Sequence, residues 1–127
     1  MIEPSQKLVK DFGRQYKQGT VLFHEGDRGK EWYIIERGAV QISKEIHAGK
    51  KVITTLDDGD FFGEMVLFTD TARTATATVI EDSTIVVISE ETFNNYVLHD
   101  ASILYLLLNK VCQRLKDTTD ELVKQMK

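Results

Sequence analysis

Cysteine and proline are almost absent from this chain of 127 residues, which contains one of each. The single cysteine, Cys112, excludes an intrachain disulfide and favours a reducing compartment. Eight glycines and one proline are too few for a low-complexity or linker-dominated chain. We therefore expect one globular domain, residues 1–127, that is stabilised by a packed core rather than by covalent cross-links.

Long apolar runs and an excess of positive charge are also missing. The longest apolar runs, such as residues 103–108, are far too short to cross a bilayer. The first residues, Met1 to Pro4, lack the basic-then-apolar pattern of a signal peptide. The formal net charge of −4 gives no general attraction for nucleic acid or for an acidic membrane. The sequence therefore predicts a cytoplasmic protein with neither of these as a partner, and an anionic ligand would need a local site.

The middle of the chain has the short-strand pattern of a β-sandwich or barrel. Turn signals separate short apolar stretches about every eight to twelve residues. Residues 47–50, His-Ala-Gly-Lys, suit a hairpin loop. The predicted strands include residues 21–23, 33–35, 40–42, 52–56, 75–79 and 85–88. We place a β-roll at about residues 19–89 and C-terminal helices at about residues 90–127.

The pattern becomes helical after Ser89. Ser89 is a favourable N-cap, and the two glutamates that follow it suit the positive end of the helix dipole. Asp100 can cap a second, longer helix that runs toward Lys127. A short N-terminal helix would carry Leu8, Val9 and Phe12. The side chains expected in the core are Trp32, Phe61, Phe62 and Phe68, with Cys112 as an inert packed thiol.

One segment, residues 59–75, departs from this rhythm because it joins two strands and is too long for a hairpin. Gly63 has no side chain to block the approach of a ligand to the backbone. Residues 65–67 could start a short helix whose free amides point at a negative group. Arg73 offers a planar fork of donors to phosphate oxygens, and Thr74 adds a hydroxyl.

Glu64 narrows the ligand class. A carboxylate beside a phosphate site repels the phosphate unless it faces another group, and a ribose hydroxyl is a natural partner for an ionised acceptor. One arginine suits a singly charged cyclic phosphate better than a triphosphate, which usually needs lysine and Mg²⁺ as well. The segment therefore predicts a site for a ribose and a phosphate.

The same segment resembles the phosphate-binding cassette of cyclic-nucleotide-binding domains. That family includes bacterial catabolite activator proteins, the regulatory subunits of cyclic-AMP-dependent kinase and the cyclic-nucleotide-gated channels. The resemblance covers roughly residues 16–115. The motifs that carry it are Gly63-Glu64-Met65-Val66-Leu67, Arg73-Thr74-Ala75, Gly19, Leu22-Phe23, Gly26-Asp27, Tyr33, Ile35, Gly38 and Gly59-Asp60-Phe61. Ala72 departs from the pattern, since many members have proline before the arginine.

The resemblance implies an eight-stranded β-roll with helices at both ends, and a regulatory sensor rather than an enzyme. Arg73 would bind the cyclic phosphate and Glu64 the ribose 2′-hydroxyl. The remaining residues implied to line the pocket are Gly63, Met65, Val66, Thr74 and Ala75. The expected ligand is cyclic AMP first, because cyclic AMP is generally prevalent in bacteria. Cyclic GMP is a close second, because the resemblance implies that a hydroxyl at Thr74 can reach the 2-amino group of a syn guanine.

The resemblance also implies that the C-terminal helix closes over the pocket as a lid and transmits the signal. Candidates on that helix for contact with the base are Tyr105, Asn109 and Gln113. No cofactor is expected beyond the cyclic nucleotide. No metal is expected either, because no two histidines stand at a ligand spacing.

A repeat of apolar residues on the C-terminal helix predicts a homodimer. Steps of four and three residues, as in a coiled-coil seam, connect Leu104, Leu108, Val111, Leu115, Thr118 and Leu122. Ile103, Leu106 and Leu107 would remain free to pack on the roll. The open alternative is that the whole helix folds back on its own roll.

Two further questions stay open at this point. The chain signals either through an unidentified effector protein or as a piece of a longer protein. A second functional class is a ligand-free dimerisation or scaffold module of the same fold, and a weaker third is a redox or haem sensor.

Overall fold

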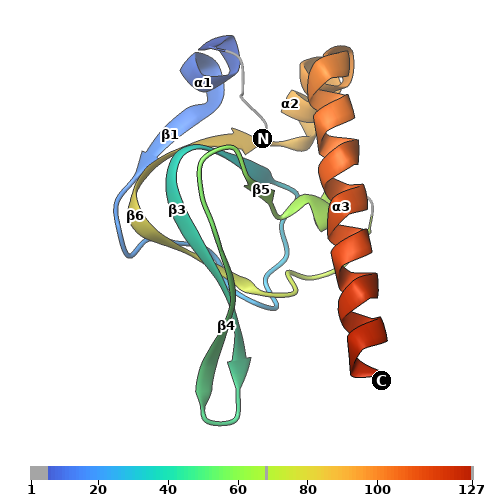
Figure 1. Ribbon diagram of the computed structural model, residues 1–127. Coiled ribbons are helices and arrows are strands. Elements are labelled where there is room, and N and C mark those ends of the chain that lie inside the picture. The colour runs from blue at the N-terminus through green and yellow to red at the C-terminus, as the bar shows by residue number, and fades with distance from the viewer. Residues whose placement is uncertain (1–5, 68, 127) are drawn as a thin grey trace.

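Two long antiparallel strands, β3 (Trp32–Ile46) and β6 (Thr76–Ile88), form the centre of the sheet (Figure 1). The computed structural model describes residues 6–67 and 69–126. The sheet order is β1 (Gly13–Tyr16), β6, β3 and β4 (Gly49–Leu56). Two short strands are added, with β2 (Val21–Phe23) paired to β6 and β5 (Phe61–Phe62) paired to β3. The predicted β-roll with helical flanks is confirmed.

The structure assigns six strands within its described residues, where the sequence suggested eight. The predicted strands 33–35 and 40–42 are one strand, β3, and the predicted strands 75–79 and 85–88 are parts of β6. Register shifts near Arg37 and Ala39 let both strands bend without breaking their pairing. The predicted hairpin joins β3 to β4, but its loop is residues 47–48, because residues 49 and 50 already belong to β4.

Alternation along β3 builds two hydrophobic clusters, one on each face of the sheet. Trp32 and Ile34 belong to the cluster that the helices cover. Tyr33 and Ile35 belong to the cluster inside the roll. Successive side chains of a strand point to opposite faces, so a sheet that is buried on both faces needs this continuous apolar run. Trp32, Phe61 and Phe62 are buried as predicted, and Phe68 lies outside the described residues.

The helices begin where the sequence predicted. The Thr92 amide donates to the Ser89 hydroxyl at 3.1 Å and caps α2 (Glu90–Asn95). The Ile103 amide donates to the Asp100 carboxylate at 3.2 Å and caps α3 (Ala101–Gln125), which follows the short helix η2 (Val97–His99). At the other end, α1 (Gln6–Phe12) buries Leu8 against the roll.

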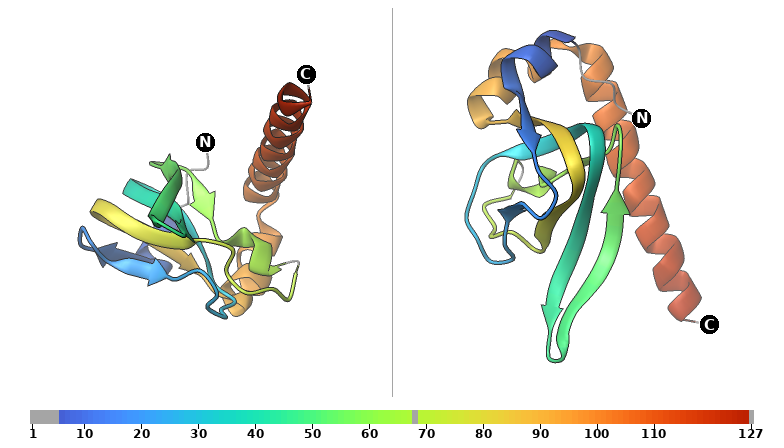
Figure 2. Two further views of the ribbon diagram at one scale, coloured as in Figure 1. Left: turned by 90° about the horizontal axis from the view of Figure 1, so that it is seen from below. Right: turned by 90° about the vertical axis from the view of Figure 1, so that its left-hand side faces the viewer.

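The apolar side chains of α3 that pack on the roll lie in its first half, and Figure 2 shows the course of the helix beside the roll. Ile103 and Leu107 are buried, whereas every described residue from 115 to 126 is exposed. Cys112 is exposed too, so the predicted packed thiol is wrong. At about 100° per residue, Cys112 lies on the helix face opposite Ile103. Within the described chain no helix combines the length and apolar character that a membrane span needs.

Candidate functional site

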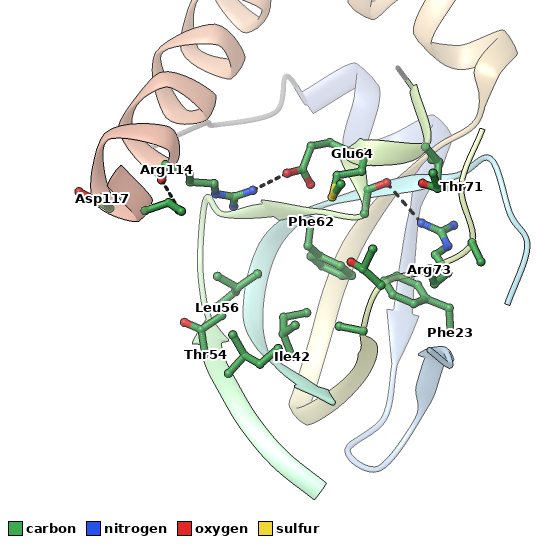
Figure 3. A pocket seen from close by; sticks show the side chains of 18 residues that line it. Phe23, Ile42, Thr54, Leu56, Phe62, Glu64, Thr71, Arg73, Arg114 and Asp117 are labelled. Atoms are coloured by element: carbon green, nitrogen blue, oxygen red, sulfur yellow. Dashed lines mark hydrogen bonds and ion pairs between the residues drawn. The ribbon is translucent and has the colours of Figure 1, made fainter. Parts of the chain in front are cut away.

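A cavity of about 490 Å³ lies between the loop after β5, strand β4 and helix α3 (Figure 3). Strand β4 contributes apolar and hydroxyl side chains to its wall, and α3 contributes polar ones. The structure brings all of the predicted site residues to this one cavity: Gly63, Glu64, Met65, Val66, Arg73, Thr74 and Ala75.

Gly63 is required by both its conformation and its surroundings. Its φ of 79° lies in the left-handed region that favours glycine. A Cβ atom at this position would lie 2.9 Å from Nη1 of Arg73. The turn leads directly into the 3₁₀ helix η1 (Glu64–Leu67), which is the short helix that the sequence predicted. The glycine therefore lets the backbone turn beside the guanidinium of Arg73.

Arg73 is fixed in place by backbone oxygens and by an aromatic ring. Only 6% of its surface is exposed. Its Nη2 donates to the Glu31 carbonyl at 2.6 Å, and its Nη1 donates to the Gly63 carbonyl at 3.3 Å. The guanidinium carbon lies 4.2 Å from the centre of the Phe23 ring. These contacts hold the side chain without neutralising its charge.

The buried charge of Arg73 is incompletely compensated. No carboxylate forms an ion pair with it among the described residues, and its buried Nε has no hydrogen-bond partner there. Burial lowers the pKa of Arg73, while the electrostatic influence of Tyr33, Glu31 and Asp27 opposes this effect. Arginine stays protonated in proteins, so the site presents a cation that lacks an anion.

Glu64 is already engaged by α3. Nη1 of Arg114 donates to Oε1 of Glu64 at 2.7 Å (Figure 3). Nη2 of Arg114 donates to the Phe61 carbonyl at 2.6 Å. The guanidinium of Arg114 also lies 4.3 Å from the centre of the Phe61 ring. The side chain of Glu64 is 17% exposed and that of Arg114 33%. The described residues offer no second partner for Oε2 of Glu64.

A second ion pair joins α3 to the entrance of the same loop. Nζ of Lys110 lies 3.0 Å from Oδ1 of Asp60. Burial alone would raise the pKa of Asp60, but the backbone N–H of Asp57 and the Lys110 ammonium outweigh burial and lower it. Two cations one helical turn apart, Lys110 and Arg114, thus attach α3 to the loop.

Arg114 is not among the site residues predicted from the sequence, although a signal for it exists. It follows Leu107 by seven residues and therefore lies on the packing face of the helix. The predicted base-contact candidates on α3, Tyr105, Asn109 and Gln113, are not among the residues that line the cavity. Tyr105 is 67% exposed. The α3 residues that line the cavity are Arg114, Asp117 and Thr118. The wall from β4, Ile53, Thr54 and Leu56, was also missed.

The family model of the cyclic nucleotide-binding domain matches residues 13–100. The chain belongs to the cyclic-nucleotide-binding domain family. Human Rap guanine nucleotide exchange factor 3 is 46% identical over 67 residues, which are 53% of this chain and 7% of that protein. Human cGMP-dependent protein kinase 2 is 35% identical over 101 residues, 74% of this chain and 13% of that one. This cyclic-nucleotide-binding domain thus spans a small fraction of the length of these relatives.

Solved structures agree with the family. The catabolite activator protein of Thermus thermophilus has a TM-score of 0.78 at 26% identity, over 91% of this chain and 55% of that one. The regulatory domain of Toxoplasma gondii PKA, solved with cAMP, has a TM-score of 0.61 at 28% identity, over 72% and 37%. The c-di-GMP-responsive global regulator CLP of Xanthomonas campestris has a TM-score of 0.74 at 27% identity, over 91% and 59%.

The last of these structures corrects one prediction. CLP links cell-cell signalling to virulence gene expression. The net charge of −4 describes this domain's own residues, so excluding nucleic acid as a partner was too broad. The exclusion does not extend to the longer proteins in which such domains occur.

Proposed function

We propose that this domain is a regulatory sensor that binds a 3′,5′-cyclic purine nucleotide, cyclic AMP first and cyclic GMP a close second. The observation that carries the proposal is the buried guanidinium of Arg73, which faces the cavity without a carboxylate partner among the described residues. A buried charge is costly unless it is paired. One cyclic phosphate would supply the single negative charge that this position lacks.

Glu64 supports a ribose rather than a deoxyribose. Its Oε1 accepts from Arg114, while Oε2 has no partner among the described residues. An ionised carboxylate can only accept hydrogen bonds, so the ribose 2′-hydroxyl would donate to it. The pairing with Arg114 also fixes the direction of the carboxylate before ligand arrives.

Arg114 supports a signal through the C-terminal helix. It is the α3 residue that contacts both Glu64 and the Phe61 carbonyl. A ligand that bonds to Glu64 alters the charge distribution around this contact, and α3 is the element on the other side of it. A ligand shifts a conformational equilibrium only by its difference in affinity between two states. In this proposal Arg114 makes the position of α3 sensitive to the ligand.

The order of the two nucleotides follows from a balance of observations. Thr74 lines the cavity, and its hydroxyl makes no hydrogen bond to the described residues, so it is free to reach a guanine amino group. The neighbour from Toxoplasma was solved with cAMP, whereas a relative is a cGMP-dependent kinase. One neutral hydrogen bond contributes only about 0.5–1.5 kcal/mol, which is too little to reverse a strong preference. Cyclic AMP therefore stays first.

Calorimetric titration of the purified chain with cyclic AMP and cyclic GMP tests the proposal. Arg73→Ala should weaken binding at least tenfold, because losing one partner of a buried charge pair costs about 2–5 kcal/mol. Arg28→Ala is the matched control, since Arg28 is exposed and lies near Asp70 outside this cavity. Equal affinity of Arg73→Ala and the parent would show that Arg73 does not bind the phosphate.

The alternative, a ligand-free dimerisation or scaffold module, has one observation in its favour. Apolar side chains remain exposed along α3, with Leu108 at 64% and Leu115 at 67%. A dimer that binds neither nucleotide would support this alternative over the sensor.

A further inference from the structure

The loop that precedes β3 also contacts Arg73. Its backbone is bonded to the backbone of Arg73 in both directions. The Arg73 amide donates to the Asp27 carbonyl at 2.8 Å, and the Gly26 amide donates to the Arg73 carbonyl at 2.8 Å. The same loop supplies the Glu31 carbonyl that accepts from Nη2 at 2.6 Å. Residues 26–31 therefore fix both the backbone and the side chain of Arg73.

Gly29 stands where this loop comes closest to the guanidinium. A Cβ atom at Gly29 would lie 2.8 Å from Nη2 of Arg73, 3.4 Å from Nε and 3.5 Å from Cζ. The φ of Gly29 is outside the left-handed region, so the angle φ does not itself require glycine here. The requirement for glycine at this position is therefore one of space.

Two glycines thus flank the guanidinium on two sides. Gly63 lies beside Nη1 and Gly29 beside Nη2. We propose that Gly29 is a positioning residue, which leaves room for Arg73 to hold its guanidinium over the Phe23 ring and aimed at the phosphate. The inference rests on the proposed function, since it assigns a role to Gly29 in the same site.

An added methyl group at Gly29 should move the arginine rather than unfold the domain. The atoms that it would meet belong to the far end of a flexible side chain, and Gly29 itself is exposed. The displaced guanidinium would lose its bond to the Glu31 carbonyl or its alignment with the ligand. Losing one charge-assisted hydrogen bond predicts about a tenfold decrease in affinity.

The test combines a spectroscopic signal with binding. In the ligand-free protein, the Nε–H resonance of Arg73 is assigned by its disappearance in Arg73→Lys. Gly29→Ala should shift this resonance and weaken cyclic AMP binding about tenfold. In the Arg73→Lys background, Gly29→Ala should change affinity less than about twofold, because no guanidinium is left to displace. This second comparison separates positioning from a general effect on the loop.

The other outcomes of this experiment distinguish the role of Gly29 from the proposed function. An unmoved resonance, or parental affinity in Gly29→Ala, overturns the role of Gly29 and leaves the proposed function standing. A shifted resonance without nucleotide binding in either protein overturns the proposed function and supports the contact. If Gly29→Ala lowers the melting temperature, Arg73→Lys should restore it by relieving the clash, and failure to restore it overturns the inference.

Discussion

Among the described residues, buried Arg73 has backbone carbonyls and an aromatic ring as partners but no carboxylate, and a buried charge is costly unless it is paired. Carbonyl oxygens orient the guanidinium of Arg73 but carry no full negative charge, so its desolvation is only partly offset. A carboxylate at this place would pair with the arginine and compete with the phosphate. Glu64 pairs with Arg114 instead, so the two charged residues of the cassette, Glu64 and Arg73, stay separate. At the scale of single residues, the site is prepared for an anion and a hydroxyl side by side.

The choice between the two purines also belongs to this scale. Thr74→Ala should weaken cyclic GMP binding relative to cyclic AMP by at most roughly tenfold, the value of one neutral hydrogen bond. Dissociation constants for both nucleotides in parent and variant give the ratio. Thr71→Ala is the control, because Thr71 lines the same cavity but its hydroxyl pairs with Thr69 at 2.9 Å. An unchanged ratio in Thr74→Ala would mean that Thr74 does not contact the base.

At the scale of elements, α3 is attached to the roll by an apolar part and an ionic part. Ile103 and Leu107 fix its first turns, and Lys110 and Arg114 bond to the loop around the pocket. Beyond Arg114 its residues are exposed on the described chain. Because these ionic contacts are made to the cassette and its entrance, a movement of this loop would be transmitted directly to α3.

The Lys110–Asp60 contact should make the attachment of α3 depend on pH. The pKa of Asp60 is lowered below its ordinary 3.8 in the folded protein, so the stabilisation is present above that value and lost as the pH falls through the lowered pKa. Lys110→Met should destabilise the domain by about 0.5–1 kcal/mol near neutral pH, since the lysine is 40% exposed.

Urea unfolding of parent and Lys110→Met between about pH 6 and about pH 2.5 measures this difference. The difference between the two proteins should shrink toward the acid end, as Asp60 becomes protonated. Lys116→Met is the control, because its pair with Asp120 is 67% and 58% exposed and should contribute almost nothing at any pH. A difference that stays constant with pH would exclude the ion pair as its source.

The elements also show which parts of the protein the sequence could predict. Ser89 and Asp100 predict where their helices begin, because an N-cap side chain accepts a hydrogen bond from the amide three residues further along the chain. The cassette is likewise a continuous segment whose residue types suit one chemistry. Arg114 and the wall from β4 reach the site only through the packing of distant segments, which local patterns do not encode. The continuity of β3 was missed for a related reason. Its residues with turn character, Arg37 and Gly38, lie at register shifts within the strand rather than in a turn.

On the scale of the whole molecule, the exposed stripe on α3 is the feature that the single chain leaves unexplained. Leu108, Leu115 and Leu122 recur every seven residues and are 64%, 67% and 57% exposed. Ile103 and Leu107 pack on the roll, which leaves this stripe on another face of the helix. A seven-residue apolar repeat is self-complementary and is typical of a coiled-coil seam. A second copy of this chain is therefore the partner that we propose for it.

Light scattering at micromolar concentration tests this dimer, and the parent should have twice the mass of one chain. Leu115→Ser should shift the protein to monomer, because a leucine buried in the seam contributes about 1.5–3 kcal/mol in each of the two helices. Val123→Ser is the matched control, since Val123 is also an exposed apolar residue of α3, 46% exposed, but directly follows the seam position Leu122 and lies off the repeat. A monomer mass for the parent, both with and without cyclic nucleotide, would mean that α3 acts only within its own chain. Dissociation by Val123→Ser to the same extent as by Leu115→Ser would instead place the contact on a different face of the helix.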